Sequence, residues 1–246
     1  MIRFIASALY LLLYLIITLP LELILFIIGK FNLPLRDKIS MFFVKNIGFK
    51  VVTFFSGANI IVNGLDNIPS DTACLFVGNH NSFFDVIISY TFMTRPTGYV
   101  AKKEFLKYPS LNVWMLFIRC LFIDRKDVKQ GMKTILKAVE YLKSGVNIFV
   151  FPEGTRSKTG EMLPFKEGSM KMADKSGCPI IPVAISNTAV MFENHFPRIT
   201  KETVVFTFCK PVYTKELEGE DKKHVGQYVQ NIIRDTLENV NKPLIS

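Results

Sequence analysis

Residues 73–90 have the sequence ACLFVGNHNSFFDVIISY, and this stretch decides the fold class. The apolar run Ala73–Val77 predicts a buried strand, and the polar residues after Gly78 open a segment whose apolar residues favour a helix. A strand that passes through a polar turn into a helix is typical of α/β folds. The C-terminal ends of strands in such folds commonly carry functional side chains, so His80 and Asp85 are the first candidates for a site.

Outward from this stretch, short β-branched or aromatic runs alternate with longer segments of helical period. The predicted strands are Asn59–Val62, Ala73–Val77, Gly98–Ala101, Leu121–Ile123, Asn147–Phe151, Ile180–Ile185 and Val204–Phe208. This alternation indicates an α/β domain over residues 58–246, built on a mixed, largely parallel sheet flanked by helices.

Two amphipathic helices are predicted within this domain. Asp127 can cap the first, and Gly145 can end it. Its apolar stripe, the side of a helix that normally packs on a core, consists of Val128, Met132, Ile135, Leu136, Val139 and Leu142. The second helix runs from about Asp221 to Val240, and Pro243 lies past its end.

The N-terminal residues 1–57 have a different character. Residues 4–21, FIASALYLLLYLIITLPL, contain no charge, and the apolar character continues to Ile28. A helix of this length can cross a bilayer, although Pro20 and Glu22 disturb its last turns. A signal peptide is disfavoured because no small-x-small cleavage site follows. The positive charges after this segment favour a position of the α/β domain on the cytoplasmic side of the cell membrane. They are Lys30, Arg36, Lys38, Lys45 and Lys50.

Residues 37–56, DKISMFFVKNIGFKVVTFFS, are too apolar for an ordinary surface helix. One interpretation is a helix that lies in the membrane interface, with its lysines reaching the headgroups. The other is a helix packed on the core of the domain. Taken as a whole, residues 1–57 are expected to form membrane-associated helices that precede the α/β domain.

The composition favours an anionic lipid partner. Lys and Arg number 30 against 21 Asp and Glu, for a net charge of +9, and 49% of the residues are hydrophobic. The charge alone suits nucleic acid, an anionic bilayer or a phosphorylated substrate. The long apolar N-terminal segments favour a phospholipid bilayer as the partner and argue against nucleic acid.

The cysteines do not indicate a metal or disulfide site. Cys74, Cys120, Cys178 and Cys209 lie far apart and form no C-x-x-C pair, and the chain has only 3 histidines. A zinc site needs such residues clustered at short spacing. We therefore expect no metal and predict buried, reduced thiols in a protein that faces the cytosol.

His80 and Asp85 can form an acid–base pair only in one local geometry. His80 can take a proton from a hydroxyl if Asp85 fixes its tautomer. Within one regular helix a spacing of five puts two side chains on different faces, so His80 must lie in the turn and Asp85 on the helix. The alternative is that Asp85 only caps a helix and His80 is an ordinary loop histidine.

A second candidate site follows another predicted strand. Residues 151–157, FPEGTRS, combine an acid, a glycine, hydroxyls and Arg156 in a short loop. An arginine with exposed N–H groups around Gly154 can grip a phosphate, although an ordinary turn would have the same composition. Lys102 and Arg125 follow two further strands. A sheet that gathers these ends at one edge would build a cationic pocket beside His80.

Together these segments resemble the glycerolipid acyltransferase family, most of all the bacterial members that acylate 1-acyl-glycerol 3-phosphate. The resemblance covers residues 59–187. Residues 79–85 match the family's His-x4-Asp motif. The second, third and fourth blocks match residues 122–125, 151–157 and 180–185 in the same order.

The resemblance implies a reaction and roles for individual residues. His80 would abstract the proton of the acceptor hydroxyl, oriented by Asp85, and the hydroxyl would attack an acyl thioester directly, without an acyl-enzyme. The implied acceptor-binding residues are Lys102, Arg125, Glu153, Gly154, Thr155 and Arg156. Arg156 is the first candidate to bind the phosphate of the acceptor. The implied acceptor is lysophosphatidic acid and the product phosphatidic acid, for phospholipid synthesis. No cofactor is implied, and acyl-CoA or acyl carrier protein would be the co-substrate.

Two positions depart from the family pattern. Arg119 stands where the second block usually opens with glycine, which puts the shape or charge of the pocket there in question, and Phe105 replaces a leucine. Rival functions are acylation of glycerol 3-phosphate or another lysolipid, and a non-enzymatic membrane lipid-binding protein. A serine lipid hydrolase is disfavoured because the chain has no G-x-S-x-G elbow.

Overall fold

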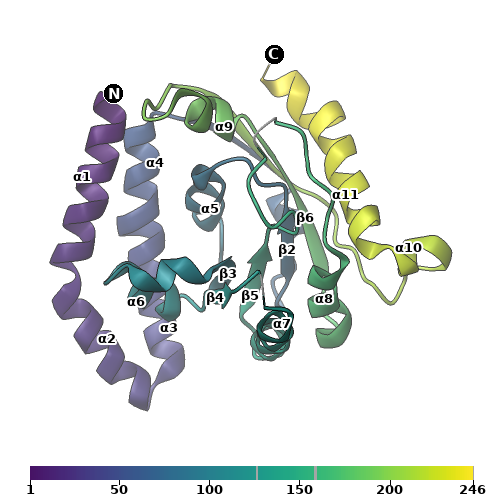
Figure 1. The fold of residues 1–246 in the computed structure, drawn as a ribbon, viewed down its shortest axis with the longest axis horizontal. Coiled ribbons are helices and arrows are strands. Elements are labelled where there is room, and N and C mark those ends of the chain that lie inside the picture. The colour runs from purple at the N-terminus through teal and green to yellow at the C-terminus, as the bar shows by residue number, and fades with distance from the viewer. Residues whose placement is uncertain (126, 158–159, 246) are drawn as a thin grey trace.

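The computed structural model describes residues 1–125, 127–157 and 160–245. A seven-stranded sheet with the order β1-β7-β6-β2-β5-β3-β4 forms the centre of this part of the chain (Figure 1). The strands are β1 Asn59–Asn63, β2 Leu75–Gly78, β3 Thr97–Lys102, β4 Leu121–Ile123, β5 Asn147–Val150, β6 Ile180–Ser186 and β7 Thr203–Phe208. All neighbouring pairs are parallel except β6 and β7. The predicted mixed, largely parallel sheet is confirmed, with strand ends shifted by one or two residues.

Helices cover both faces of this sheet (Figure 1). They are α1 Ile2–Ile17, α2 Leu19–Phe31, α3 Leu33–Phe42, α4 Lys50–Ser56, α5 Phe83–Tyr90, α6 Leu111–Phe117, α7 Val128–Lys143, α8 Lys171–Ser176, α9 Thr188–Met191, α10 Gly219–Lys223 and α11 Val225–Thr236. Side chains of successive strand residues point to opposite faces, so β2 contributes to two cores. Phe76 packs with α1–α6 on one face, and Leu75 and Val77 pack with α7, α8 and α11 on the other.

The predicted N-terminal membrane helix is broken at Thr18. α1 and α2 meet there at an angle of 52°. Pro20 lies in the first turn of α2. Because proline cannot donate the backbone hydrogen bond that would continue α1, the chain starts a new helix instead.

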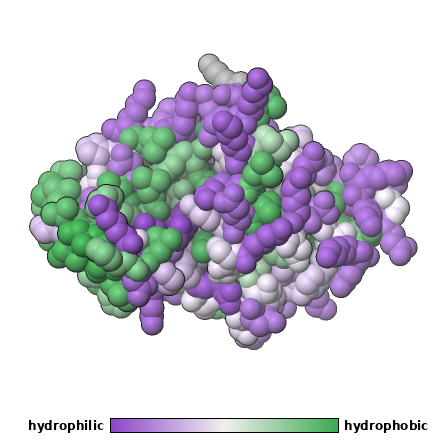
Figure 2. Space-filling model, turned by 90° about the horizontal axis from the view of Figure 1, so that it is seen from below, coloured by the Kyte–Doolittle hydropathy of each residue, from purple (hydrophilic) through white to green (hydrophobic). Residues whose placement is uncertain are grey.

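The segment Leu33–Ser56 is continuous and helical, with a π-helical stretch at Phe43–Phe49 between α3 and α4. Val44 and Val52 are buried in the core, so the prediction of a packed helix holds for one side of it. On the other side Phe54 is 80% exposed. By length and composition it is the one described helix that could cross a membrane, and the bent pair α1–α2 would make a second span. Hydrophobic groups gather over the N-terminal helices at the left of Figure 2.

α7 presents a different face to the sheet from the one that its sequence pattern predicts. Asp127 caps it as expected, since its Oδ1 accepts the N–H of Gln130 at 3.0 Å. Three residues of the predicted apolar stripe are nevertheless exposed, at 85%, 45% and 47%: Val128, Met132 and Leu136. The buried residues are instead Thr134, Ala138, Val139 and Leu142. Only the C-terminal half of the stripe therefore faces the core.

The position of β4 at the edge of the sheet explains why α7 presents this face to the sheet. β4 ends the sheet, so the polar groups on its outer side have no neighbouring strand. Gln130 donates to the Phe122 carbonyl at 2.7 Å and accepts from the Asp124 N–H at 2.9 Å, and Thr134 donates to the same carbonyl at 3.3 Å. Because an unpaired buried backbone group is unfavourable, these two polar side chains turn toward β4.

The predicted C-terminal helix is also interrupted. α10 ends at Lys223 and α11 starts at Val225. Glu167 accepts the N–H groups of Gly226 and Gln227 at 2.8 and 3.2 Å. These bonds satisfy backbone donors in the first turn of α11, which stabilises a new helix start at this point.

Candidate functional site

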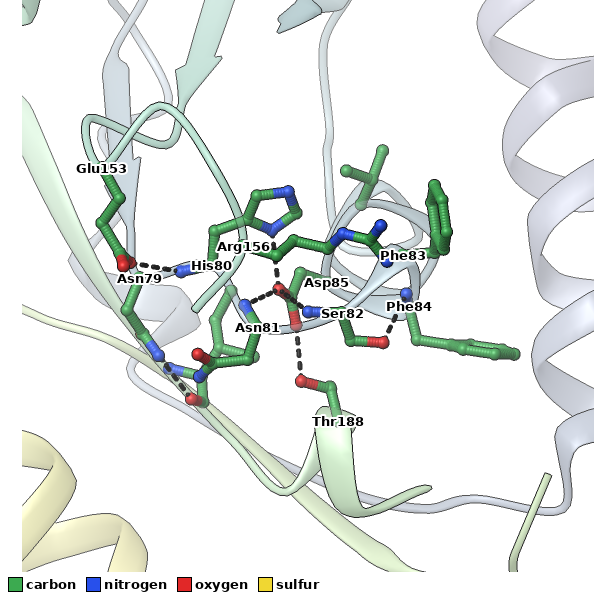
Figure 3. Close-up of polar contacts among 12 residues, drawn as sticks. Asn79, His80, Asn81, Ser82, Phe83, Phe84, Asp85, Glu153, Arg156 and Thr188 are labelled. Carbon is green, nitrogen blue, oxygen red and sulfur yellow. Dashed lines mark hydrogen bonds and ion pairs between the residues drawn. The ribbon is translucent and has the colours of Figure 1, made fainter. Parts of the chain in front are cut away.

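The turn between β2 and α5 brings His80 and Asp85 together (Figure 3). Ser82 caps α5, accepting the N–H of Phe84 at 3.0 Å. Asp85 Oδ2 accepts the N–H groups of Asn81 and Ser82 at 2.7 and 2.8 Å, and it lies 2.8 Å from His80 Nδ1. Asp85 therefore both stabilises the turn and pairs with His80. The sequence had offered helix capping and pairing with His80 as alternatives, and Asp85 does both.

Asp85 fixes the orientation and the tautomer of His80. The Asp85 side chain is 0% exposed. Its second oxygen, Oδ1, accepts the Thr188 hydroxyl at 2.5 Å. A carboxylate only accepts hydrogen bonds, so His80 Nδ1 carries the hydrogen and Nε2 keeps its lone pair. Phe151 stacks on the imidazole at a centroid distance of 4.1 Å and limits its rotation. Nε2 is thus available as a proton acceptor.

Glu153 and Gly154 lie in the loop after β5, the strand that pairs with β2, and Glu153 binds the backbone of this turn. The oxygens Oε1 and Oε2 of Glu153 accept the N–H groups of His80 and Leu163 at 2.7 and 2.9 Å. Burial raises the pKa of Glu153. Gly154 has φ of +75°, a conformation that favours glycine. Neither residue is among the described residues that line the cavity beside His80, and the Glu153 carboxylate instead connects the backbone of His80 to that of Leu163.

Five of the predicted site residues line one cavity of about 1080 Å³: His80, Lys102, Arg125, Thr155 and Arg156. The rest of the lining includes a long apolar wall, formed by Phe49, Tyr90, Leu111, Met115, Ile118 and other residues. Cations and an apolar wall in the same cavity suit an anionic amphiphile. Lys103, which follows Lys102 in the chain, is not among the described residues that line the cavity, and its ammonium pairs with Asp124 at 2.5 Å.

Arg156 is positioned by two residues that the sequence did not single out. Its Nη1 donates to Glu193 Oε1 at 2.9 Å, and its guanidinium lies 3.9 Å from the centre of the Phe83 ring. The same carboxylate oxygen accepts the N–H of Phe83 at 2.8 Å. Glu193 follows α9, far from the motifs in sequence. No local pattern marks Glu193 or Thr188, since their partners are set by the chain topology.

Cys120 is a cysteine in the lining of this cavity. Burial raises its pKa to about 12, so the thiol stays protonated at neutral pH. It is therefore no activated nucleophile, and among the described residues His80 is the one histidine that lines the cavity.

Arg119, the departure from the family pattern, points away from the cavity lining. Its backbone has φ of +65°, which explains why glycine is common there. Its guanidinium donates to Asp37 Oδ2 on α3, with Nε at 2.8 Å and Nη2 at 2.7 Å. Arg36 binds the other oxygen of the buried Asp37 at 2.7 Å. The ion pair between Arg119 and Asp37 thus links α3 to the segment that leads into β4.

This pairing predicts different stabilities for two substitutions at one position. Arg119→Ala is expected to lower the free energy of unfolding by about 1–3 kcal/mol, because Asp37 stays buried with one partner fewer. Arg119→Gly should be less harmful by about 1 kcal/mol, since glycine tolerates the positive φ. Urea unfolding in detergent measures both. Equal losses would show that the backbone strain is negligible, and no loss would contradict the role of the ion pair.

Comparison with known proteins agrees with this site. The sequence pattern of the acyltransferase family matches residues 59–186, just over half of the chain. The chain therefore belongs to the acyltransferase family.

Several individual proteins of this family are similar to the chain. The chain is 35% identical over 144 residues to a 1-acyl-sn-glycerol-3-phosphate acyltransferase of Borreliella burgdorferi, covering 58% of this chain and 57% of that protein. It is 29% identical over 180 residues to the enzyme of the same name from Cocos nucifera, covering 72% and 58%. The matches thus span a little over half the length of these relatives. The crystal structure of the 1-acyl-sn-glycerophosphate acyltransferase PlsC from Thermotoga maritima has the same fold, with a TM-score of 0.72, 24% identity and coverage of 97% and 98%.

Proposed function

We propose that this protein transfers a fatty acyl group from an acyl thioester to the sn-2 hydroxyl of 1-acyl-glycerol 3-phosphate, which yields phosphatidic acid. The observation that carries the proposal is the His80–Asp85 pair beside a cavity with both cations and a long apolar wall. The names of the relatives from Borreliella burgdorferi and Cocos nucifera support this acceptor. The thioester is that of acyl-CoA or acyl carrier protein.

The geometry supports direct transfer. His80 Nε2 takes the proton of the acceptor hydroxyl as its oxygen attacks the thioester carbonyl carbon. The tetrahedral intermediate then expels the thiolate, which takes the proton back from the imidazolium. Asp85 stabilises the imidazolium between these steps, because its negative charge lies 2.8 Å from Nδ1. No residue of the protein needs to carry the acyl group.

The acceptor phosphate is assigned to the cationic part of the cavity. Arg156 is the first candidate, because Phe83 and Glu193 hold its guanidinium in place and a planar fork matches phosphate oxygens. Lys102 and Arg125 line the same cavity. Thr155 can add a hydroxyl. Glu153 and Gly154 act indirectly, through the loop that carries Arg156.

The N-terminal helices are assigned to the membrane. Residues 1–57 would hold the α/β domain of residues 58–246 on the cytoplasmic side of the cell membrane. Phe49, from the segment between α3 and α4, contributes to the apolar wall of the cavity. An acyl chain in the cavity would therefore meet the same segment that exposes apolar side chains on its other side.

The direct test is an assay of the purified protein in phospholipid micelles with one acyl-CoA and one acyl carrier protein donor. Lysophosphatidic acid, glycerol 3-phosphate and lysophosphatidylcholine are offered as separate acceptors. We expect lysophosphatidic acid to be acylated with the highest kcat/KM. Failure to acylate it with either donor would overturn the proposal, and preference for glycerol 3-phosphate would replace the acceptor.

Arg156→Ala tests the phosphate assignment. Charge-assisted hydrogen bonds contribute about 1.5–3 kcal/mol, so we expect the KM for lysophosphatidic acid to rise by about 10- to 150-fold, with a smaller change in kcat. Arg234→Ala, on the exposed side of α11, is the matched control and should change neither constant. An unchanged acceptor KM in Arg156→Ala would refute the assignment.

A further inference from the structure

The exposed side of α7 carries a strip of apolar and basic residues that the core does not use. We call it the α7 strip, and it consists of Val128, Lys129, Met132, Lys133, Leu136 and Lys137. These positions repeat every four residues, so they form two adjacent rows along one side of the helix. The row of Val128, Met132 and Leu136 is at least 45% exposed at each residue.

The second row of the α7 strip is cationic. Lys137 pairs with Glu140 on the same helix at 2.5 Å. Lys129 and Lys133 have no carboxylate partner among the residues that the structure describes. From Lys129 to Lys137 the row extends over eight residues, which at 1.5 Å per residue is about 12 Å. An array of this length fits the acidic side of another helix better than one compact anionic group.

The α7 strip begins close in sequence to a residue that lines the cavity. Arg125 lines the cavity and is exposed, three residues before Val128. The turn Lys103–Lys107 and α7 both pack against β4, and the turn carries further exposed lysines. A ligand that lies along α7 therefore has one end near Arg125, which lines the same cavity as His80.

The strip belongs to a different side of the molecule from the apolar N-terminal helices. α7 shares its core with α8 and α11, on the opposite face of the sheet from α1–α4. In Figure 1 α7 lies below the sheet, whereas α1 and α2 form the left edge. The concentration of hydrophobic groups at the left of Figure 2 lies over the N-terminal helices. A protein partner is therefore favoured over the bilayer for the α7 strip.

We propose that the α7 strip is the docking site of an acyl carrier protein, a small acidic helical protein that presents the acyl thioester. This inference rests on the proposed function. Acidic side chains of the carrier pair with Lys129, Lys133 and Lys137, and its apolar residues pack on Met132 and Leu136. Docking beside Arg125 brings the thioester arm to the part of the cavity that Arg125 lines.

Two double variants test the strip with two donors of the same acyl chain. For Lys129→Glu with Lys133→Glu, and separately for Met132→Gln with Leu136→Gln, we expect kcat/KM with the acyl carrier protein donor to fall at least tenfold. Turnover of acyl-CoA should stay within twofold. Lys222→Glu with Lys223→Glu on α10 makes the same charge change elsewhere and should leave both donors within twofold. Added salt should slow the carrier-protein reaction of wild type more than that of the lysine variant.

The outcomes separate this inference from the proposed function. Wild type that uses acyl-CoA but not the carrier protein, or variants that use both donors like wild type, would overturn docking on α7. An equal loss with both donors, together with loss of binding to anionic phospholipid vesicles, would make the strip a bilayer contact. If the Glu variant loses stability, Lys129→Gln with Lys133→Gln repeats the test. No turnover by wild type with either donor would overturn the proposed function and this inference together.

Discussion

His80→Ala is expected to lower kcat with lysophosphatidic acid by about 10²- to 10⁴-fold, the usual contribution of a positioned general base. The substitution removes Nε2, the proposed proton acceptor. The fold should survive, because Asp85 keeps the N–H groups of Asn81 and Ser82 and the hydroxyl of Thr188 as donors. The backbone N–H of His80 also keeps its bond to Glu153.

Steady-state kinetics and thermal unfolding of the same preparation measure both parts of this prediction. His195→Ala changes an exposed histidine in another loop and is the control for losing an imidazole. Retention of wild-type turnover by His80→Ala would remove the general base from the mechanism. If wild type binds lysophosphatidic acid without turning it over and His80→Ala binds equally well, the protein is a lipid-binding protein.

Asp85→Asn is expected to have the second large effect on kcat. This substitution removes the negative charge of Asp85 but can keep its hydrogen bonds, so it tests the charge separately. The Asn carbonyl oxygen can take the place of Oδ2 and accept from His80, Asn81 and Ser82. Its NH2 group can then take the place of Oδ1 and donate to the Thr188 hydroxyl, which can accept as well as donate. We therefore expect a small change in stability but a fall in kcat of about 10²- to 10⁴-fold, since the imidazolium loses its counter-charge.

Asp85→Ala provides the contrast. It leaves the N–H groups of Asn81 and Ser82 without their acceptor in a buried turn, at a cost of about 1–3 kcal/mol for each unpaired group. Kinetics and urea unfolding of the two variants side by side separate the two roles. Asp85→Asn with near wild-type kcat would mean that Asp85 only shapes the turn.

The lysine-rich helix α7 shows where sequence patterns stop being sufficient. Its start, its cap at Asp127 and its end near Gly145 follow from local signals, and all three are confirmed. The side that faces the core was predicted wrongly for its first half, because the pattern of apolar residues does not show that β4 is the edge strand. A helix beside an edge must satisfy open backbone groups, and Gln130 and Thr134 do so here.

The sequence by itself predicted the strands and helices of the α/β domain, singled out His80 and Asp85 as a candidate pair, and showed the resemblance to the family. These features depend on residues close together in the chain, where propensity, spacing and capping act locally. Only the tertiary structure decided that Thr188, 103 residues from Asp85, completes its hydrogen bonds, and that Glu193 holds Arg156. The structure also shows that Glu153 accepts the backbone N–H of His80 and that Arg119 forms an ion pair with Asp37. Neither partner could be predicted from the sequence. Such partners are set by the order of strands in the sheet, which brings distant segments together and which no local pattern encodes.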